Sequence, residues 1–493
     1  MIRSLRFLRS LALVLSVSCV PSLRAASAPS PVSPLPSPSG APRPNLLFIV
    51  VDDLNADLGV FGVPAARTPH IDRLVARGVR FDRAYCQFPL CSPSRESFLS
   101  GRRPESTGAL AQGKLVRDTQ PDATYLPAYF RRHGYFTGAA GKVFHKNDDA
   151  SWDRYDEANP ISPQEIATLK GRAATRQRGE NSPEWLALDC DDADTGDGIV
   201  ARRIAALLRE RAASPDQKPF FLAAGFRKPH LPWTAPKKYF AQFPRTAIPP
   251  LAEPPMRDIP PLALQTDLFG TTPPADRQEA AAAYYACVSF IDAQVGVLLA
   301  ALDEQKLWES TVVVFVADHG FHLGDHGGLW AKLTNFERCA RVPFAIVAPH
   351  SPHAGRATAA VIENLDLYPT LAELAGLPRP AHLEGRSLAP LLADPTAPWN
   401  HPAFTTTIHE GIIGRSVRTN RWRYTEWGDS VATELYDQSA DPGNYRNLAA
   451  DPALASERAT LKKLLAQNPR APAIPADAQS PRAQKPKKKS PAP

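Results

Sequence analysis

Residues 91–95 read Cys-Ser-Pro-Ser-Arg and bring together side chains that could do chemistry at one point. If a helix starts at Cys91, then Cys91 and Arg95 share one face of it, because residues i and i+4 lie one above the other. Pro93 suits the first turn of that helix, whose free N–H groups attract anions. A lone cysteine is more often a small buried hydrophobic residue, so this interpretation needs support from the rest of the chain.

Two acidic pairs are candidates for metal ligands. Asp52 and Asp53 follow the apolar run 45–51, and Asp318 with His319 follows the β-branched run 311–317. Carboxylate oxygens suit a hard divalent ion such as calcium or magnesium, and one imidazole among them is less typical but allowed. A single pair of this kind is more often a turn or a helix cap. Two such pairs in one fold favour a shared cation.

Further basic side chains recur next to predicted strand ends. Lys142 and His145 lie in Gly-Lys-Val-Phe-His, Lys332 lies in Trp-Ala-Lys, and His230 follows Lys-Pro. Most lysines are surface charges, but cations at strand ends are what an anionic substrate requires. The turn of His230 is rigid enough to aim it as a proton donor. His322 and His326 are interpreted as structural.

Apolar runs alternate with helical patterns through most of the chain. Strands are expected at 45–51, 136–140, 220–225, 311–317 and 344–347, and helices at 68–76, 124–132, 198–211, 278–302 and 366–375. This alternation predicts an α/β fold with a mostly parallel sheet between helices, whose ligands bind beyond the carboxyl ends of the strands. Short strand-like runs between 403 and 436 predict a small antiparallel sheet.

Composition and the chain ends complete the predicted organisation. The 493 residues are 43% hydrophobic with a net charge of +7, much of it near the C-terminus. No basic face with interleaved aromatics is visible, so we expect no nucleic-acid partner. We predict a signal peptide (1–26), a Pro/Ser-rich linker (27–43), a catalytic domain (44–398), a C-terminal subdomain (399–466) and a disordered basic tail (467–493).

The signal peptide predicts an exported protein, periplasmic or secreted. Its apolar run is too short to indicate a membrane span, and Cys19 is a weaker candidate for lipid attachment because Ser16 fits poorly before it. Export removes Cys19 and leaves five cysteines. An odd number in an oxidising compartment means that at least one is unpaired or is no longer a thiol.

The ordered set of motifs resembles the sulfatases that use formylglycine, most closely the iduronate-2-sulfatase branch. The resemblance spans roughly residues 43–450. The motifs that carry it are residues 51–55, 91–95, 141–145, 228–232, 317–320 and 330–332. It implies an alkaline-phosphatase/sulfatase-like fold, with a mixed, mostly parallel sheet sandwiched by helices and a smaller C-terminal antiparallel-sheet subdomain.

The same resemblance implies a role for each candidate residue. Cys91 would be converted to formylglycine by a formylglycine-generating enzyme, and its hydrate would attack sulfur and later expel sulfate. One calcium ion would be held by Asp52, Asp53, Cys91, Asp318 and His319. Arg95 would hold the formylglycine, Lys142 and Lys332 the sulfate, His145 would assist the hydrate, and His230 would protonate the leaving alcohol.

The implied function is hydrolysis of sulfate esters of sulfated sugars, with 2-O-sulfated uronic acid in glycosaminoglycan-type polysaccharides as the expected substrate. Two alternatives stay open at this point. One is a phosphoester or phosphonate monoester hydrolase of the same superfamily. The other is a catalytically inactive, sugar-binding pseudosulfatase in which Cys91 remains a thiol.

Overall fold

The structure is a computed structural model that describes residues 43–63, 66–157, 184–248, 253–265 and 274–470. These residues all belong to one compact unit, Leu35–Pro493. The predicted signal peptide, nearly all of the linker and residues 471–493 of the predicted tail lie outside the described residues.

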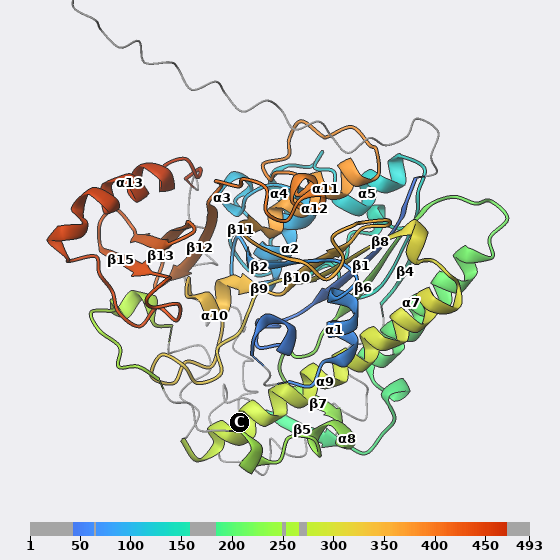
Figure 1. Cartoon of the computed structure of the whole chain (residues 1–493), viewed down its shortest axis with the longest axis horizontal. Coiled ribbons are helices and arrows are strands. Elements are labelled where there is room, and N and C mark those ends of the chain that lie inside the picture. Colours follow the sequence, from blue (N-terminus) through green and yellow to red (C-terminus); the bar gives the residue numbers. More distant parts are fainter. Residues whose placement is uncertain (1–42, 64–65, 158–183, 249–252, 266–273, 471–493) are drawn as a thin grey trace, which may run out of the picture. The chain divides into compact units, whose positions relative to one another are not determined.

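A nine-stranded mixed sheet forms the centre of this unit (Figure 1). Its order is β11-β2-β10-β8-β1-β6-β3-β4, with β9 paired to β2. The strands are β1 (Asn45–Val51), β2 (Val79–Tyr85), β3 (Phe136–Gly141), β4 (Arg154–Asp156), β6 (Phe220–Phe226), β8 (Thr311–Ala317), β9 (Arg341–Val342), β10 (Phe344–Val347) and β11 (Ala357–Glu363). Pairing is parallel from β8 through β1, β6 and β3 to β4, whereas β10 runs antiparallel to both of its neighbours. The predicted mixed, mostly parallel sheet is confirmed.

Strand β1 lies in the middle of the sheet because its sequence is continuously apolar. Residues 46–51 are each at most 1% exposed, between β8 on one side and β6 on the other. A run without polar alternation is what a strand buried on both faces requires.

Helices cover both faces of the sheet. The helices of the described residues are α1 (Pro69–Val75), α2 (Cys91–Ser100), α3 (Pro104–Thr107), α4 (Val116–Thr119), α5 (Leu126–Arg132), α7 (Gly196–Ala212), α8 (Lys237–Phe240), α9 (Pro274–Glu304), α10 (Glu337–Ala340), α11 (Leu367–Leu374), α12 (Ala389–Ala393) and α13 (Ala455–Leu465), of which α8 and α13 pack elsewhere. Figure 1 shows α1, α7 and α9 on one side of the sheet and α5, α11 and α12 on the other. A two-stranded sheet of β5 (Trp185–Leu188) and β7 (Trp233–Pro236) contacts α9.

The C-terminal part forms a separate antiparallel sheet in the order β12-β13-β14-β15. Its strands are β12 (Ala403–His409), β13 (Ile412–Arg418), β14 (Trp422–Trp427) and β15 (Ala432–Asp437). Val417 and Leu435 pack against Leu461 and Leu465 of α13 in a small hydrophobic core. The predicted antiparallel sheet is therefore confirmed.

Helix α9 is the one helix in the described part of the chain that is long and apolar enough to cross a membrane. Of its most apolar window, 78% is buried inside the fold. Core helices pass the same test of length and composition, so α9 is weak support for a membrane span.

Candidate active site

The parallel strands place their following residues at one edge of the sheet. Val51 at the end of β1 pairs with Ala317 of β8 and with Phe226 of β6. The two segments stay side by side one residue beyond the strands, because the Asp318 N–H donates to the Val51 carbonyl at 3.1 Å. The residues after β1 and β8, which include both acidic pairs, therefore meet.

Two glycines allow β3 and β6 to end close together. Gly141 has a φ of +74°, and a Cβ built on it would lie 2.3 Å from the carbonyl oxygen of Gly225. A Cβ on Gly225 would lie 2.1 Å from the carbonyl carbon of Lys142. The Lys142 N–H donates to the Gly225 carbonyl at 2.8 Å. The two backbones are therefore too close for a side chain at position 141 or 225, which is why glycine is needed at both. This close contact brings Lys142 to the same edge of the sheet.

Helix α2 begins at Cys91, as predicted, and all ten of its residues are buried. The Cys91 sulfur lies 3.0 Å from Lys332 Nζ and 3.3 Å from His319 Nε2. Burial and Asp52 oppose ionisation of the thiol, but Lys142, Lys332 and His319 outweigh them and hold the pKa of Cys91 well below its usual value. Position 91 therefore favours a negatively charged atom.

Arg95 lies one turn further along α2 and is fully buried. Its Nε donates to Asp318 Oδ2 at 2.8 Å, and Nη1 donates to the carbonyls of Lys142 and of Val143, the latter at 3.0 Å. Its Nη2 lies 3.6 Å from Asp52 Oδ1. Arg95 thus ties the segments after β1, β3 and β8 to the helix that starts at Cys91.

Four of the five predicted metal ligands form a tight group. Donor atoms of Asp52, Asp53, Cys91 and His319 all lie within 4.8 Å of one another. The Nδ1–H of His319 donates to the Gly320 carbonyl at 3.0 Å, so Nε2 faces the group. Burial opposes protonation of His319, but Asp318 outweighs burial and raises the pKa of His319 to about 9, so a metal ion at Nε2 would have to displace a proton. Asp318 lies next to the group, but Oδ2 is bonded to Arg95 and Oδ1 accepts two backbone N–H groups.

Two lysines face the acidic group. Lys332 Nζ lies 2.6 Å from Asp53 Oδ1, and Lys142 Nζ is paired with Asp52 Oδ2. Burial opposes ionisation of Asp52, but Lys142 above all overcomes it and holds the pKa of Asp52 well below its ordinary value. The two candidate sulfate-binding cations therefore flank the sulfur of Cys91 and the carboxylates.

The candidate residue His145 has a hydrogen-bond partner that the sequence motifs do not indicate. The side-chain amide of Gln112 lies 3.1 Å from the ring nitrogens of His145, and its oxygen accepts the Ser92 N–H of α2. Burial, followed by Lys142, lowers the pKa of His145 to about 4, so its imidazole is neutral near pH 7.

His230 is half-buried, and its Nδ1–H donates to the Leu231 carbonyl at 2.6 Å. The carboxylate of Asp197 accepts the N–H groups of Arg227 and Lys228 at 2.7 and 3.0 Å and fixes the turn that carries His230. Asp197 lies in the first turn of α7, where an acid is common, so its position alone gives no functional signal.

The loop that presents Lys332 is held by a buried network. The ring of His322 bonds to Asp325 through Nδ1 and lies 2.7 Å from the Thr334 hydroxyl through Nε2. Its backbone N–H donates to the Ala331 carbonyl at 2.7 Å. His322 was predicted to be structural, and both of its ring nitrogens are engaged within the protein. The group His322, Asp325 and His326 is close enough to bind a metal, but these bonds already use its donors.

A buried cysteine beside cations, at the carboxyl edge of a parallel sheet, is the arrangement expected of an enzyme site for an anionic substrate. Comparison with known proteins agrees with this class. The family description "Sulfatase" matches residues 44–377, and "N-sulphoglucosamine sulphohydrolase, C-terminal" matches residues 324–471. The chain belongs to the sulfatase family of sulfuric ester hydrolases.

Individual relatives cover most of both chains. A sulfatase of Formosa agariphila is 32% identical over 86% of this chain and 86% of its own. Iduronate 2-sulfatase of Homo sapiens is 30% identical over 83% of this chain and 91% of its own. Among solved structures, phosphonate monoester hydrolase SpPMH from Silicibacter pomeroyi has a TM-score of 0.72 at 23% identity, covering 86% of this chain and 95% of its own. The 2-O GAG sulfatase BT1596 has a TM-score of 0.67 at 24% identity, covering 86% and 92%. These structures share the fold.

Proposed function

We propose that this protein is an exported sulfatase that removes sulfate from sulfated sugars, with 2-O-sulfated uronic acid in glycosaminoglycan-type chains as substrate. The observation that carries the proposal is the position of Cys91, whose sulfur lies between Lys332 and His319 beside two buried carboxylates. The relatives named iduronate 2-sulfatase support the choice of sugar.

We propose that Cys91 acts after oxidation to formylglycine by a formylglycine-generating enzyme, which supplies an aldehyde hydrate as the oxygen nucleophile. Residues 91–95 contain the Cys-x-Pro-x-Arg sequence that such an enzyme reads. Cys91 is 0% exposed in the folded chain and, within the described residues, forms no disulfide. Since the thiol is inaccessible after folding, we infer that oxidation precedes the burial of α2.

The residues present fit a divalent cation. Asp52 Oδ1 is buried and accepts no hydrogen bond, so this oxygen is available as a ligand. With sulfur at position 91 the donor set is mixed, whereas oxidation would replace the soft thiolate by oxygen and favour a hard ion. We propose that Asp52, Asp53, His319 and position 91, with Asp318 beside them, hold one calcium ion, which supplies a Lewis acid near the sulfate when bound.

The other side chains have roles that follow from charge and position. Lys142 and Lys332 are placed to neutralise sulfate oxygens as the ester bond breaks. Arg95 keeps position 91 in line with the strand ends through its bonds to Asp318 and to two carbonyls. His145 is neutral near pH 7, so a ring nitrogen can accept a hydrogen bond from the aldehyde hydrate. His230, with Nε2 left for the substrate, is placed to protonate the leaving alcohol.

We further propose that residues 1–26 direct export and are removed, so that the enzyme works outside the cytoplasm. In this scheme residues 44–398 form the catalytic domain and residues 399–466 a subdomain beside it. Packing of α13 on β13 and β14 supports treating the C-terminal sheet as a subdomain with its own core.

The test is release of inorganic sulfate from disaccharides that differ only in the position of the sulfate ester. We expect turnover of the 2-O-sulfated uronic acid disaccharide and little of a 6-O-sulfated hexosamine disaccharide. Hydrolysis of the 6-O ester alone would refute the uronate assignment. Faster turnover of a phosphonate monoester than of every sulfate ester would instead favour the alternative hydrolase function.

A further inference from the structure

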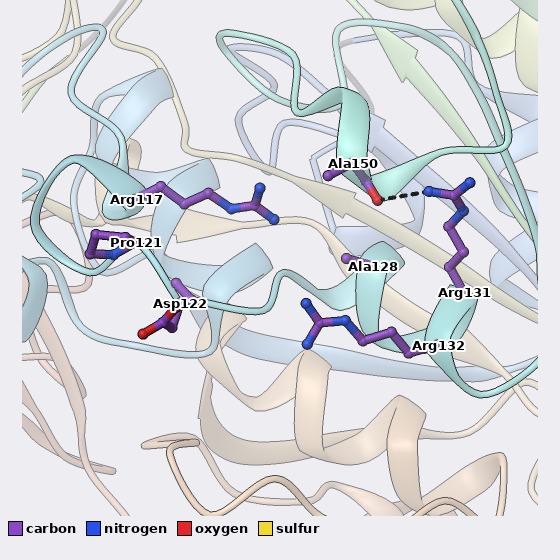
Figure 2. A pocket seen from close by; sticks show the side chains of 8 residues that line it. Arg117, Pro121, Asp122, Ala128, Arg131, Arg132 and Ala150 are labelled. Atoms are coloured by element: carbon purple, nitrogen blue, oxygen red, sulfur yellow. Dashed lines mark hydrogen bonds between the residues drawn. The ribbon is translucent and has the colours of Figure 1, made fainter.

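A groove of about 480 Å³ lies outside the candidate active site (Figure 2). Three arginines line it, and Figure 2 shows Arg117 on one side, with Arg131 and Arg132 on the other. Asp122 is the one acidic residue among the described lining residues. The lining side chains taken alone therefore carry three positive charges and one negative charge.

Two of these guanidinium groups are held in place by carboxylates that do not line the groove. Arg117 Nη1 lies 2.8 Å from Asp148 Oδ1, and its guanidinium lies over the ring of Tyr125. Arg131 Nε lies 2.8 Å from Asp153 Oδ1, and Nη1 donates to the Ala150 carbonyl at 3.3 Å. Such contacts hold the guanidinium groups in place before a ligand binds, which reduces the conformational entropy lost on binding.

Arg132 differs from the other two because it has no carboxylate partner among the described residues. Its Nη1 donates to the Thr124 hydroxyl at 2.8 Å, and the side chain is exposed. The remaining N–H donors of a guanidinium suit a sulfate or a carboxylate, which can accept two of them at once. The groove therefore offers two arginines that are held in place by carboxylates and one arginine that has no carboxylate partner among the described residues.

The groove shares its walls with segments that build the active site. Arg117 belongs to α4, and the N–H of Val116 in this helix donates to Glu96 of α2 at 2.8 Å. Asp148, the partner of Arg117, lies three residues after His145 in the segment that follows β3. Arg131 lies further away, because its partner Asp153 accepts the N–H of Thr137 near the amino end of β3, whereas Lys142 follows the carboxyl end of that strand. Only a long substrate chain could therefore contact both the centre and the groove.

We propose that this groove binds a sulfate or carboxylate group on a distant residue of the same acidic polysaccharide whose sulfate ester is hydrolysed at the centre around Cys91. The proposal rests on the function proposed above and adds an accessory binding site for polymeric substrate. The enzyme would hold long acidic chains more tightly than short ones.

The test is binding of a size-defined heparin octasaccharide to the full protein, measured by calorimetry at several salt concentrations. The double variant R131A/R132A removes two guanidinium groups, and R73A/R209A is the matched control. Arg73 and Arg209 are exposed, and each has an aspartate or glutamate partner on the surface. We expect Kd to rise about five- to tenfold in R131A/R132A, and the slope of log Kd against log salt to fall by about two. The control should bind like wild type.

The outcomes separate this proposal from the proposed function. Equal octasaccharide affinity for R131A/R132A and wild type would overturn the groove proposal. A second outcome would also overturn the groove proposal. If the wild-type protein binds inorganic sulfate as tightly as the octasaccharide, and R131A/R132A weakens both equally, the groove binds a free anion rather than a polysaccharide. Sulfate release from a small ester by the wild-type protein, measured in parallel, reports on the proposed function without involving the groove.

Discussion

Substitution of Lys332 by Met probes the charge nearest to position 91 while keeping much of the side chain's bulk. Lys332 Nζ lies 3.0 Å from the Cys91 sulfur and 2.6 Å from Asp53 Oδ1. A unit charge at 3.0 Å interacts by about 5 kcal/mol at an effective dielectric constant of about 20. Lys142 remains and water can enter, so part of this energy is retained. We therefore expect kcat to fall about 10²- to 10³-fold, as for loss of one preorganised donor.

The assay is steady-state sulfate release by K332M, with K237M as the control. Lys237 also pairs with an aspartate, at 2.5 Å, but its side chain is 69% exposed, so its removal should leave kcat unchanged. Circular dichroism and Tm establish that both variants are folded. A kcat for folded K332M within about threefold of wild type would refute the role of Lys332 as a charge that acts in the transition state.

Three further predictions concern metal binding, the loop of Lys332 and pH. Dialysis against EGTA should lower Tm by several degrees and abolish sulfate release, and calcium should restore both; unchanged Tm and activity would exclude a required ion. His322→Leu should lower the free energy of unfolding by about 2–3 kcal/mol, since it removes hydrogen-bond partners from Asp325 and Thr334. It should also lower kcat with little change in KM. Urea unfolding and steady-state kinetics test both effects, and an unaltered kcat would show that His322 does not position Lys332. Burial raises the pKa of Asp292 from 3.8 to about 7, so the folded state binds the extra proton, and its contribution to stability is full below about pH 4 and lost as pH rises through 7. Asp292→Asn should therefore flatten the fall of Tm between pH 5 and 8, and an unaltered pH profile would contradict this.

Much of the fold was predictable because its signals are local. The continuous apolar runs of β1 and β8 and the helical patterns of α7 and α9 each lie within one segment. The convergence of Asp52 and Asp318 followed from a general property of parallel sheets rather than from any single motif. Strands β2 and β11 were not predicted, because β2 alternates with charged residues and the first half of β11 alternates between exposed and buried residues.

The partners of the site residues were not predictable in the same way. Gln112 contacts His145 across 33 residues of sequence, and the Tyr284 hydroxyl donates to the Asp53 carbonyl across 231 residues. Asp53 itself has a φ of +60°, a conformation that its neighbours in sequence do not indicate. Such bonds depend on how distant segments pack, whereas the motif Cys-x-Pro-x-Arg depends on spacing alone.

The proposed function requires the side chain at position 91 to be an oxidised nucleophile. Mass spectrometry of the tryptic peptide 84–95, from protein produced together with a formylglycine-generating enzyme, tests it most directly. We expect an aldehyde at position 91 in the active protein, and sulfate release that rises in proportion to the fraction converted. Full activity in protein whose peptide carries only an unmodified thiol would contradict it.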